Sequence, residues 1–379
     1  MIVQHPMLWC AAFLMAGIAV GLQFPLRLWL PLLAVAVVCC TVLRNRSGHL
    51  HDVLVLVVWF LLGSSRAAIG PVFEVRPEWQ QTLDREARHA RTFLVERLRT
   101  AGLSPRTLAL CSALTVGQKD GLKRETRRAY NRVGAGHLLA LSGMHLGIIY
   151  GFLYSVLIRR VRQSKWRWHA LPPILLLLWG YVLVAGMPVS LLRAALMLSG
   201  LTFISLMQYR TDPLHLLALS AVIMMLAAPS DLLSISFQLS FSAVFFLLAL
   251  WRPLQDRLPA LHWTVSLLAV SCVASLGTMP LSAYYFHSVS LVGPLLSIAL
   301  IPLTSAIIYL SLAAMLLPVE PLGRLLNSLE AVQQDIIDEA GSLPWASLGD
   351  IRPSALTVAF IYGVMLVAIV RLRTNPAVA

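Results

Sequence analysis

About eleven long apolar runs follow one another along this chain, and they constrain its fold more than any other feature. They cover residues 7–24, 28–43, 53–70, 138–158, 170–186, 188–207, 213–228, 234–251, 263–281, 290–317 and 354–371. A helix needs about 20 predominantly apolar residues to cross the core of a bilayer. Only 12% of the residues are charged, against about 25% in soluble chains. The sequence therefore predicts an all-α, polytopic membrane protein with about 10–11 transmembrane helices.

The run at 290–317 is too long for one simple span, and Gly293, Pro294 and Pro302 interrupt it. Such residues are typical of broken or re-entrant helices, so we expect a break in this segment. The five cysteines show no metal-type spacing. They are interpreted as small buried apolar residues, and we expect no metal and no cofactor.

The runs and the polar stretches between them predict four regions. These are an N-terminal region of three spans (1–70), a basic extracytoplasmic helical segment (71–133), the main membrane domain (134–318), and an amphipathic helix with a C-terminal span (319–379). Glu330, Asp335, Asp338 and Glu339 place acids on the amphipathic helix, which we expect to lie at the membrane interface.

The charge of the chain is distributed unevenly, with a formal net value of +13. Basic residues in short loops set the orientation of a membrane protein and mark its cytoplasmic face. Those loops carry Arg44, Arg46, Arg159, Arg160, Arg162, Lys165, Arg167, Arg210, Arg252 and Arg257. Segment 71–133 then falls on the outer face, although it holds many more basic than acidic residues. Either this topology is wrong at the segment, or the positive charge serves a purpose outside; a long loop can also be translocated regardless of its charge.

A dense polar cluster opens the fourth apolar run. Its candidate functional residues are Gly134, Gly136, His137, Ser142, Gly143 and His145. Glycines allow close helix approach or a broken backbone, and polar groups inside a membrane need partners. On a regular helix Ser142 and His145 would share a face. Four readings stay open: a hydrated pore lining, a nucleophilic serine with its base, a weak metal pair, or helix packing alone.

Other candidates lie further along the chain. Arg193 is a charge near the start of an apolar run, where it needs water or a partner, unless it extends to the surface. Gln238 adds an amide to the eighth run. Tyr284, Tyr285 and His287 end the ninth run, where aromatic residues form a membrane-interface belt or, facing a pore, offer surfaces on which bases stack.

Several motifs resemble the ComEC-type competence proteins in the same order. Ala113–Leu122 and Gly136–His145 are similar to that family's A-L-x-x-G-D-x-x-x-L and H-L-L-A-x-S-G-x-H segments. Further similar segments are Val189–Leu196, Asp212–Leu219, Ser236–Ala243, Gly277–Leu281 and Ser290–Gly293. The resemblance covers about residues 93–317.

The resemblance implies a multi-pass channel core in the bacterial cytoplasmic (inner) membrane that carries single-stranded DNA inward during natural transformation, with 134–318 as the channel domain. The cluster at 134–145, Arg193, Gln238 and the aromatic group would line the pore. Six basic residues would contact the DNA backbone, namely Lys119, Lys123, Arg124, Arg127, Arg128 and Arg132. A separate DNA receptor, a nuclease and a cytoplasmic ATPase or helicase are the implied partners, besides the lipid bilayer.

The sequence also departs from the family. Fuller members carry a small β-barrel domain and a metallo-β-lactamase-like domain, and we find neither pattern, so we expect a channel or transporter without a nuclease domain in this chain. Gln118 stands where an acidic residue is usual, and Ser297 stands where asparagine is usual. Two alternatives remain: a transporter of another anionic metabolite or lipid, and an intramembrane Ser/His hydrolase, which lacks an evident orienting acid.

Overall fold

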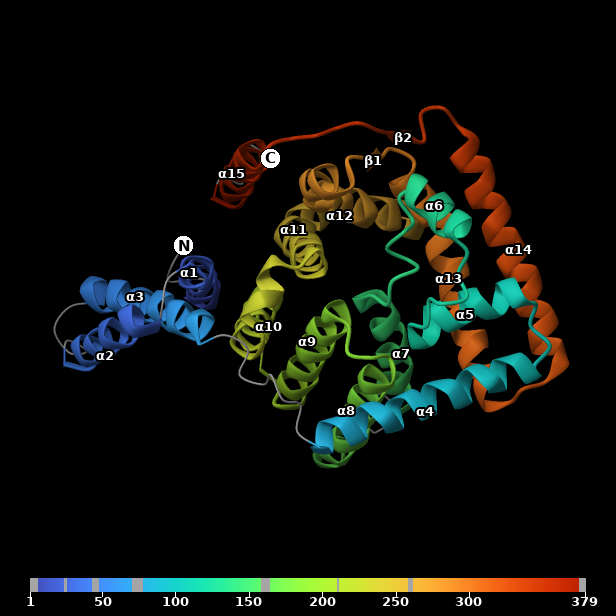
Figure 1. Ribbon diagram of the computed structural model, residues 1–379, viewed down its shortest axis with the longest axis horizontal. Coiled ribbons are helices and arrows are strands. Elements are labelled where there is room, and N and C mark those ends of the chain that lie inside the picture. Colours follow the sequence, from blue (N-terminus) through green and yellow to red (C-terminus); the bar gives the residue numbers. More distant parts are fainter. Residues whose placement is uncertain are drawn as a thin grey trace. The chain divides into compact units, whose positions relative to one another are not determined.

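The computed structural model describes residues 6–23, 26–42, 48–69, 78–157, 164–209, 211–257 and 262–374. Within these ranges the chain forms fifteen α-helices, one 3-10 helix and one two-stranded sheet (Figure 1). Four helices are long and apolar enough to cross a membrane: α9 (Val189–Leu206), α12 (Trp263–Phe286), α13 (Gly293–Leu316) and most of α15 (Ala355–Thr374). Shorter apolar helices occur as well, so the all-α membrane class predicted from the sequence is confirmed.

The described residues divide into two compact units. The first contains Met1–Pro77 and Ser199–Phe241, with α1 (Pro6–Gly21), α2 (Leu26–Val42), α3 (Gly48–Ala68), α10 (Pro213–Ala227) and η1 (Pro229–Leu233). Helices α1 and α3 approach closely, and Ser64 on α3 donates a hydrogen bond of 2.9 Å to the carbonyl of Gly17 on α1. Small residues allow such approach, and the hydroxyl then gains a buried acceptor.

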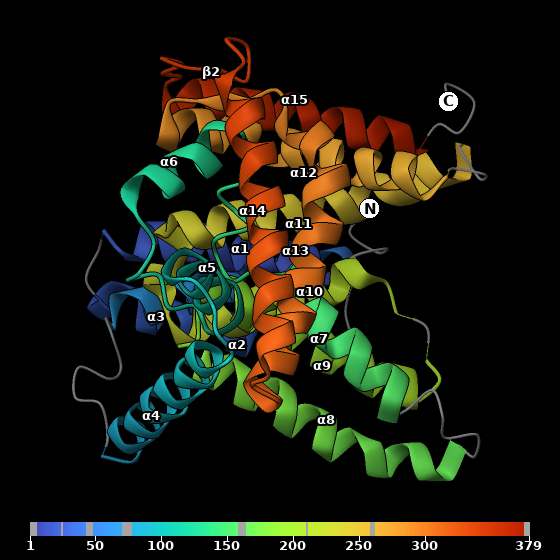
Figure 2. The same ribbon diagram turned by 90° about the vertical axis from the view of Figure 1, so that its right-hand side faces the viewer.

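The second unit contains Glu78–Leu198 and Ser242–Ala379. Its further helices are α4 (Glu78–Thr100), α5 (Pro105–Val116), α6 (Arg124–Arg132), α7 (Gly143–Leu157), α8 (Ser164–Val184) and α14 (Glu320–Ser342), while α9 and α11 (Ile235–Arg257) continue from one unit into the other. Strand β1 (Val289–Ser290) pairs antiparallel with β2 (Ser347–Leu348). Helices α13 and α14 run side by side, vertically in Figure 2, whereas α12 and α15 run horizontally there.

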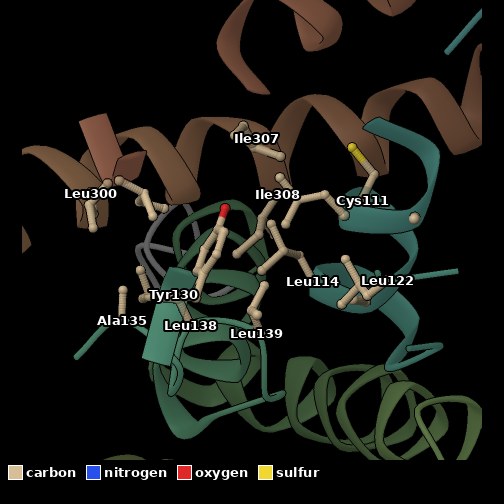
Figure 3. Close-up of a cluster of buried hydrophobic side chains, with 14 of the residues drawn as sticks. Cys111, Leu114, Leu122, Tyr130, Ala135, Leu138, Leu139, Leu300, Ile307 and Ile308 are labelled. Carbon is tan, nitrogen blue, oxygen red and sulfur yellow. The ribbon is translucent and has the colours of Figure 1, made fainter. Parts of the chain in front are cut away.

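The core of the second unit lies between α5, α6 and α13 (Figure 3). Tyr130 of α6 is 1% exposed and lies in a cluster that includes Leu114, Leu138, Ile307 and Ile308. Apolar burial of this kind supplies most of the stability of a folded domain. The core therefore fixes α6 and the loop after it against α13.

Two expectations about helix boundaries are wrong. Helix α13 is continuous, because Gly293 and Pro294 occupy its first turn, where a missing N–H costs nothing, and Pro302 is accommodated inside it. The fourth apolar run does not open as a helix either. Gly134 adopts a φ of 74° just after α6 ends, residues 134–142 form turns, bends and irregular backbone, and α7 begins only at Gly143.

Arginine side chains cap the C-terminal ends of three apolar helices. Arg91 of α4 donates to the carbonyl of Val184 at the end of α8. Arg97, also on α4, donates to the last carbonyls of α13, and Arg66 of α3 donates to those of α10. The final carbonyls of a helix have no partner within it, and leaving them unpaired is costly where water is scarce. Part of the basic charge of these segments is therefore structural.

The close contact between α14 and the end of α4 yields a stability prediction. A Cβ on Gly323 would collide with the carbonyl oxygen of Ala101, whereas a Cβ on Gly363 of α15 meets nothing within 4 Å. Gly323→Ala should lower the free energy of unfolding by about 1–3 kcal/mol. Thermal unfolding in detergent measures this as a lower Tm, with Gly363→Ala as the matched control. A Tm for Gly323→Ala equal to that of the control would contradict the packing.

Candidate nucleic-acid interface

Helix α6 separates its basic residues from its buried ones. Tyr130 points into the core, and Ala129 is half-buried. At 100° per residue, the four arginines occupy an arc of about 140° on the opposite side of the helix. The exposed basic residues of this helix and the preceding turn are Lys119, Lys123, Arg124, Arg127, Arg128 and Arg132. The structure thus places all six predicted backbone-contact residues at the surface.

The turn before α6 belongs to the same surface. Gly117 ends α5 in the left-handed conformation, and Leu122 is buried below the turn. Arg127 donates a hydrogen bond to the carbonyl oxygen of Lys119, which ties the turn to the helix. Partial burial, and then the nearby charge of Arg127, lower the pKa of Lys119. We call these six residues, on the turn and on α6, the basic face.

Other basic residues of segment 71–133 have partners within the protein. Arg106 forms an ion pair of 2.8 Å with Glu330, and Arg99 pairs with Glu96 at 3.2 Å. Arg91 and Arg97 cap helix ends, as described above. Arg76 and several of the predicted orientation residues, Arg44, Arg46, Arg159, Arg160, Arg162 and Arg210, lie outside the described residues. Arg85 and Arg88 of α4 are exposed as well, so the basic face is the set of exposed cations that lies on α6 and the turn before it.

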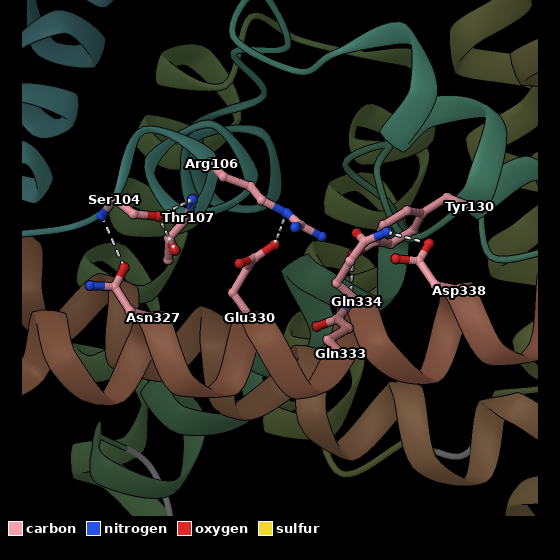
Figure 4. A network of polar contacts seen from close by, with 9 residues as sticks. All are labelled: Ser104, Arg106, Thr107, Tyr130, Asn327, Glu330, Gln333, Gln334 and Asp338. Atoms are coloured by element: carbon pink, nitrogen blue, oxygen red, sulfur yellow. Dashed lines mark hydrogen bonds and ion pairs between the residues drawn. The ribbon is translucent and has the colours of Figure 1, made fainter.

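Helix α14 supports the basic face through buried polar contacts (Figure 4). Gln333 is 0% exposed, and its Nε2 donates to the hydroxyl of Tyr130 at 3.1 Å and to that of Thr304 at 3.3 Å. Asn327 accepts the backbone N–H of Ser104 at 2.9 Å. Sequence reasoning missed these residues, because amides on an amphipathic helix are usually taken as solvated. Asp335, Asp338 and Glu339 are exposed, as the amphipathic pattern predicts.

Glu330 is the charged member of these contacts. Its side chain is 7% exposed, whereas that of Arg106 is 53% exposed. Burial raises the pKa of the Glu330 carboxyl, and the charge and hydrogen bond of Arg106 act in the opposite direction. The pair therefore links α14 to the first turn of α5 at the edge of the core.

The loop between α6 and α7 depends on two of the predicted glycines. A Cβ on Gly134 would lie 2.5 Å from the Cβ of Ser290 in β1, and a Cβ on Gly136 would collide with the side chain of Asn131. His137 is exposed, and its Nδ1 lies 2.9 Å from the carbonyl oxygen of Gly134. These glycines allow close approach of the backbone, which is the packing reading of the cluster.

Ser142 and His145 lie in contact at the start of α7. The Nδ1 atom of His145 accepts the backbone N–H of Ser142 at 3.2 Å and lies 2.8 Å from its hydroxyl oxygen. This is one half of a capping box, the bond by which the third helical residue reaches back to the N-cap N–H. In a Ser/His hydrolase the other ring nitrogen needs an orienting acceptor, and Nε2 of the fully buried His145 has none among the described residues.

Arg193 lies against the first residue of α7. It is 5% exposed, and its Nη2 is 2.9 Å from the position of a Cβ on Gly143. The structure therefore brings Gly143, Ser142, His145 and Arg193 together in the second unit. Gln238 belongs to the first unit, where its Nε2 donates to the carbonyl of Leu232. Among the described residues no group of three His, Cys, Asp or Glu side chains is arranged to hold a metal ion.

The aromatic group lies at the end of α12. Tyr284 and Tyr285 contact each other edge to face, with ring centroids 5.0 Å apart, and Tyr285 is half-buried. His287 is exposed and ends the helix with a φ of 55°. Phe286, between these residues, is 57% exposed.

Comparisons with known proteins point to one family. The sequence profile described as "Competence protein" matches residues 114–375. ComE operon protein 3 of Bacillus subtilis (strain 168) is 33% identical over 201 residues, which are 53% of this chain and 25% of that protein. Recombination protein 2 of Haemophilus influenzae is 29% identical over 221 residues, which are 54% of this chain and 28% of that protein.

An uncharacterized protein of Aquifex aeolicus is 29% identical over 251 residues, which are 66% of this chain and 56% of that protein. The matches thus span about a quarter of the length of the first two relatives and just over half of the third. No solved structure matches the chain.

The capping geometry at α7 yields a prediction that separates stability from chemistry. Glutamine is a natural third residue of a capping box. His145→Gln should therefore keep a stability close to that of the wild type, whereas His145→Ala should lose about 1 kcal/mol. Chemical unfolding of the two variants in detergent measures the difference. Equal losses in both would show that the imidazole ring itself, and not the bond to Ser142, is needed.

Proposed function

This chain belongs to the competence protein family, and on that premise we propose that it forms the core of an inner-membrane channel that carries single-stranded DNA inward during natural transformation. Its substrate would be the DNA strand, and its surroundings the lipid bilayer. The proposal rests on family membership, the predicted orientation and the basic face. A DNA receptor, a nuclease and an ATPase or helicase, which the family resemblance implies, are proposed as its partners.

The observation that carries the proposal is the basic face. A phosphate backbone binds clustered Lys and Arg side chains because binding releases condensed counterions. Six exposed cations on one turn and one short helix suit a linear polyanion better than they suit a compact metabolite, which would need a few convergent groups in a pocket. Two exposed acids, Asp120 and Glu125, lie on the same segment and leave an excess of positive charge.

The orientation of the chain supports the same use. The loops that carry the orientation charges define the cytoplasmic face, and segment 71–133 then lies outside. The basic face would receive the strand before it enters the channel. Residues Gly143, Ser142, His145 and Arg193 would lie next on its path as a narrow, polar part of the pore.

Neutralising the basic face tests the proposal directly. The triple variant Arg124→Gln, Arg128→Gln, Arg132→Gln should bind a labelled single strand more weakly. Its plot of log affinity against log salt concentration should be less steep by about 0.7 for each lost phosphate contact, or roughly 2 in total. Fluorescence anisotropy of the purified protein in detergent measures both quantities.

The matched control has the same charge change on α4, where Arg85, Arg88 and Arg99 are exposed. The triple variant Arg85→Gln, Arg88→Gln, Arg99→Gln should keep the salt slope of the wild type. In a deletion strain, the α6 variant should lose uptake of radiolabelled DNA while its membrane level stays unchanged. Normal uptake with the α6 variant would overturn the proposed function and favour another anionic substrate.

A further inference from the structure

The C-terminal end of α12 presents aromatic rings at the surface. Phe286 is 57% exposed and Tyr284 is 37% exposed, while Tyr285 is half-buried and contacts Tyr284 edge to face. Exposed rings supported by a neighbouring ring keep their orientation better than free side chains do. Such rings are the usual surface on which the bases of a single strand stack.

This end of the helix is held in place by the sheet. His287 takes a left-handed φ of 55°, and its carbonyl accepts the N–H of Ile351 at 3.2 Å. Two residues later β1 pairs with β2, with Val289 opposite Leu348. A left-handed residue other than glycine persists only where its surroundings over-determine it. The aromatic end is therefore a fixed feature of the second unit.

The aromatic end lies close to the basic face. Ser290, four residues after Phe286, contacts Gly134, which is two residues after Arg132. A chain advances by at most about 3.6 Å per residue, so Arg132 and Phe286 are no more than about 30 Å apart. At about 3.4 Å or more per nucleotide, a strand of fewer than about ten nucleotides spans this distance. A single-strand binding site commonly covers about 4–16 nucleotides, so one strand can reach both places.

The surroundings of the aromatic end are mixed in character. Leu291 follows β1 and Leu348 lies in β2, and each is 49% exposed. The segment that bonds to His287 carries Asp350 and Arg352, and both are exposed. The charge of Arg352 adds a cation near the rings. This cation, together with the basic face, favours an anionic ligand that also offers bases for stacking.

We propose that Phe286 and Tyr284 form the base-stacking part of a single-stranded DNA surface whose phosphate-binding part is the basic face of α6. This inference rests on the proposed function and adds a preference for single-stranded over duplex DNA. Stacking needs bases that are not paired, so the combined surface would prefer a single strand to a duplex. The basic face alone would bind either form, because phosphates carry no such information.

Two ligands of equal charge test the proposal. One is a short labelled oligothymidylate, and the other is an abasic phosphodiester of the same length, which has phosphates but no bases. The double variant Tyr284→Ala, Phe286→Ala should lose at least about five-fold in affinity for the oligothymidylate, from the size of a base–aromatic stack. Its affinity for the abasic strand should stay at the wild-type value. The full chain in detergent is used throughout.

Two controls complete the experiment. Phe93→Ala removes a ring on α4 that is 64% exposed and should change neither affinity. Phe286→Trp keeps a stacking surface and should restore most of the binding to the oligothymidylate. Equal losses on both ligands, or no loss on either, would overturn the base-stacking role of these rings.

Binding of the same two ligands by the α6 triple variant distinguishes this inference from the proposed function. If the α6 triple variant weakens binding of both ligands while the aromatic variant affects neither, the proposed function stands and only this inference fails. If the α6 variant changes neither ligand, the proposed function fails. Crosslinking with bromodeoxyuridine-containing strands should in addition yield adducts at Tyr284 or Phe286, and adducts confined to other residues would contradict the inference.

Discussion

The burial of the Tyr130 side chain holds helix α6, which carries the basic face, in position. Helix α6 has nine residues, and isolated helices shorter than about 12–15 residues are marginal in water. Four of its residues are arginines that repel one another along one side. Tyr130 counters this by entering the core beside Leu138 and Ile308, and its hydroxyl gains a partner in Gln333. Without that contact the cations would have no fixed arrangement to offer a ligand.

Helix α14 extends the same support to α5. Polar groups away from water are costly unless they are paired. On α14, Gln333 bonds to Tyr130 and Thr304, Asn327 bonds to Ser104, and Glu330 pairs with Arg106. Such a set of contacts favours one arrangement of α14 against α5 and α6 over alternatives, because a shifted register would leave several buried groups unpaired. The half-exposed pair of Arg106 and Glu330 thus contributes more to the position of α14 than to net stability.

Sequence reasoning gave the class and the family, because both depend on properties that local sequence carries. Apolar runs of membrane length and an ordered set of motifs need no tertiary information, and the family is confirmed. The six cations of the basic face were also named from the sequence, and the structure places them at the surface, four on α6 and two before it. Their role in binding DNA stays a prediction.

The remaining features depend on contacts between distant segments. Whether Arg97 faces solvent or caps α13 is decided 218 residues away, at Met315. Gln333 donates a hydrogen bond to Tyr130, which lies 203 residues earlier in the chain. Ser142 and His145 do meet, but as the cap of a helix that begins later than its apolar run. No local pattern distinguishes these uses from a solvated charge or a catalytic pair.

Photocrosslinking in transforming cells is the most direct test of the central claim. A benzophenone amino acid replaces Arg128 on the basic face, or Arg88 on α4 as the comparison, in an otherwise functional chain. The account predicts that incoming DNA crosslinks at position 128 and not at position 88. Normal transformation with no DNA crosslink at position 128, or with equal crosslinks at both positions, would contradict it.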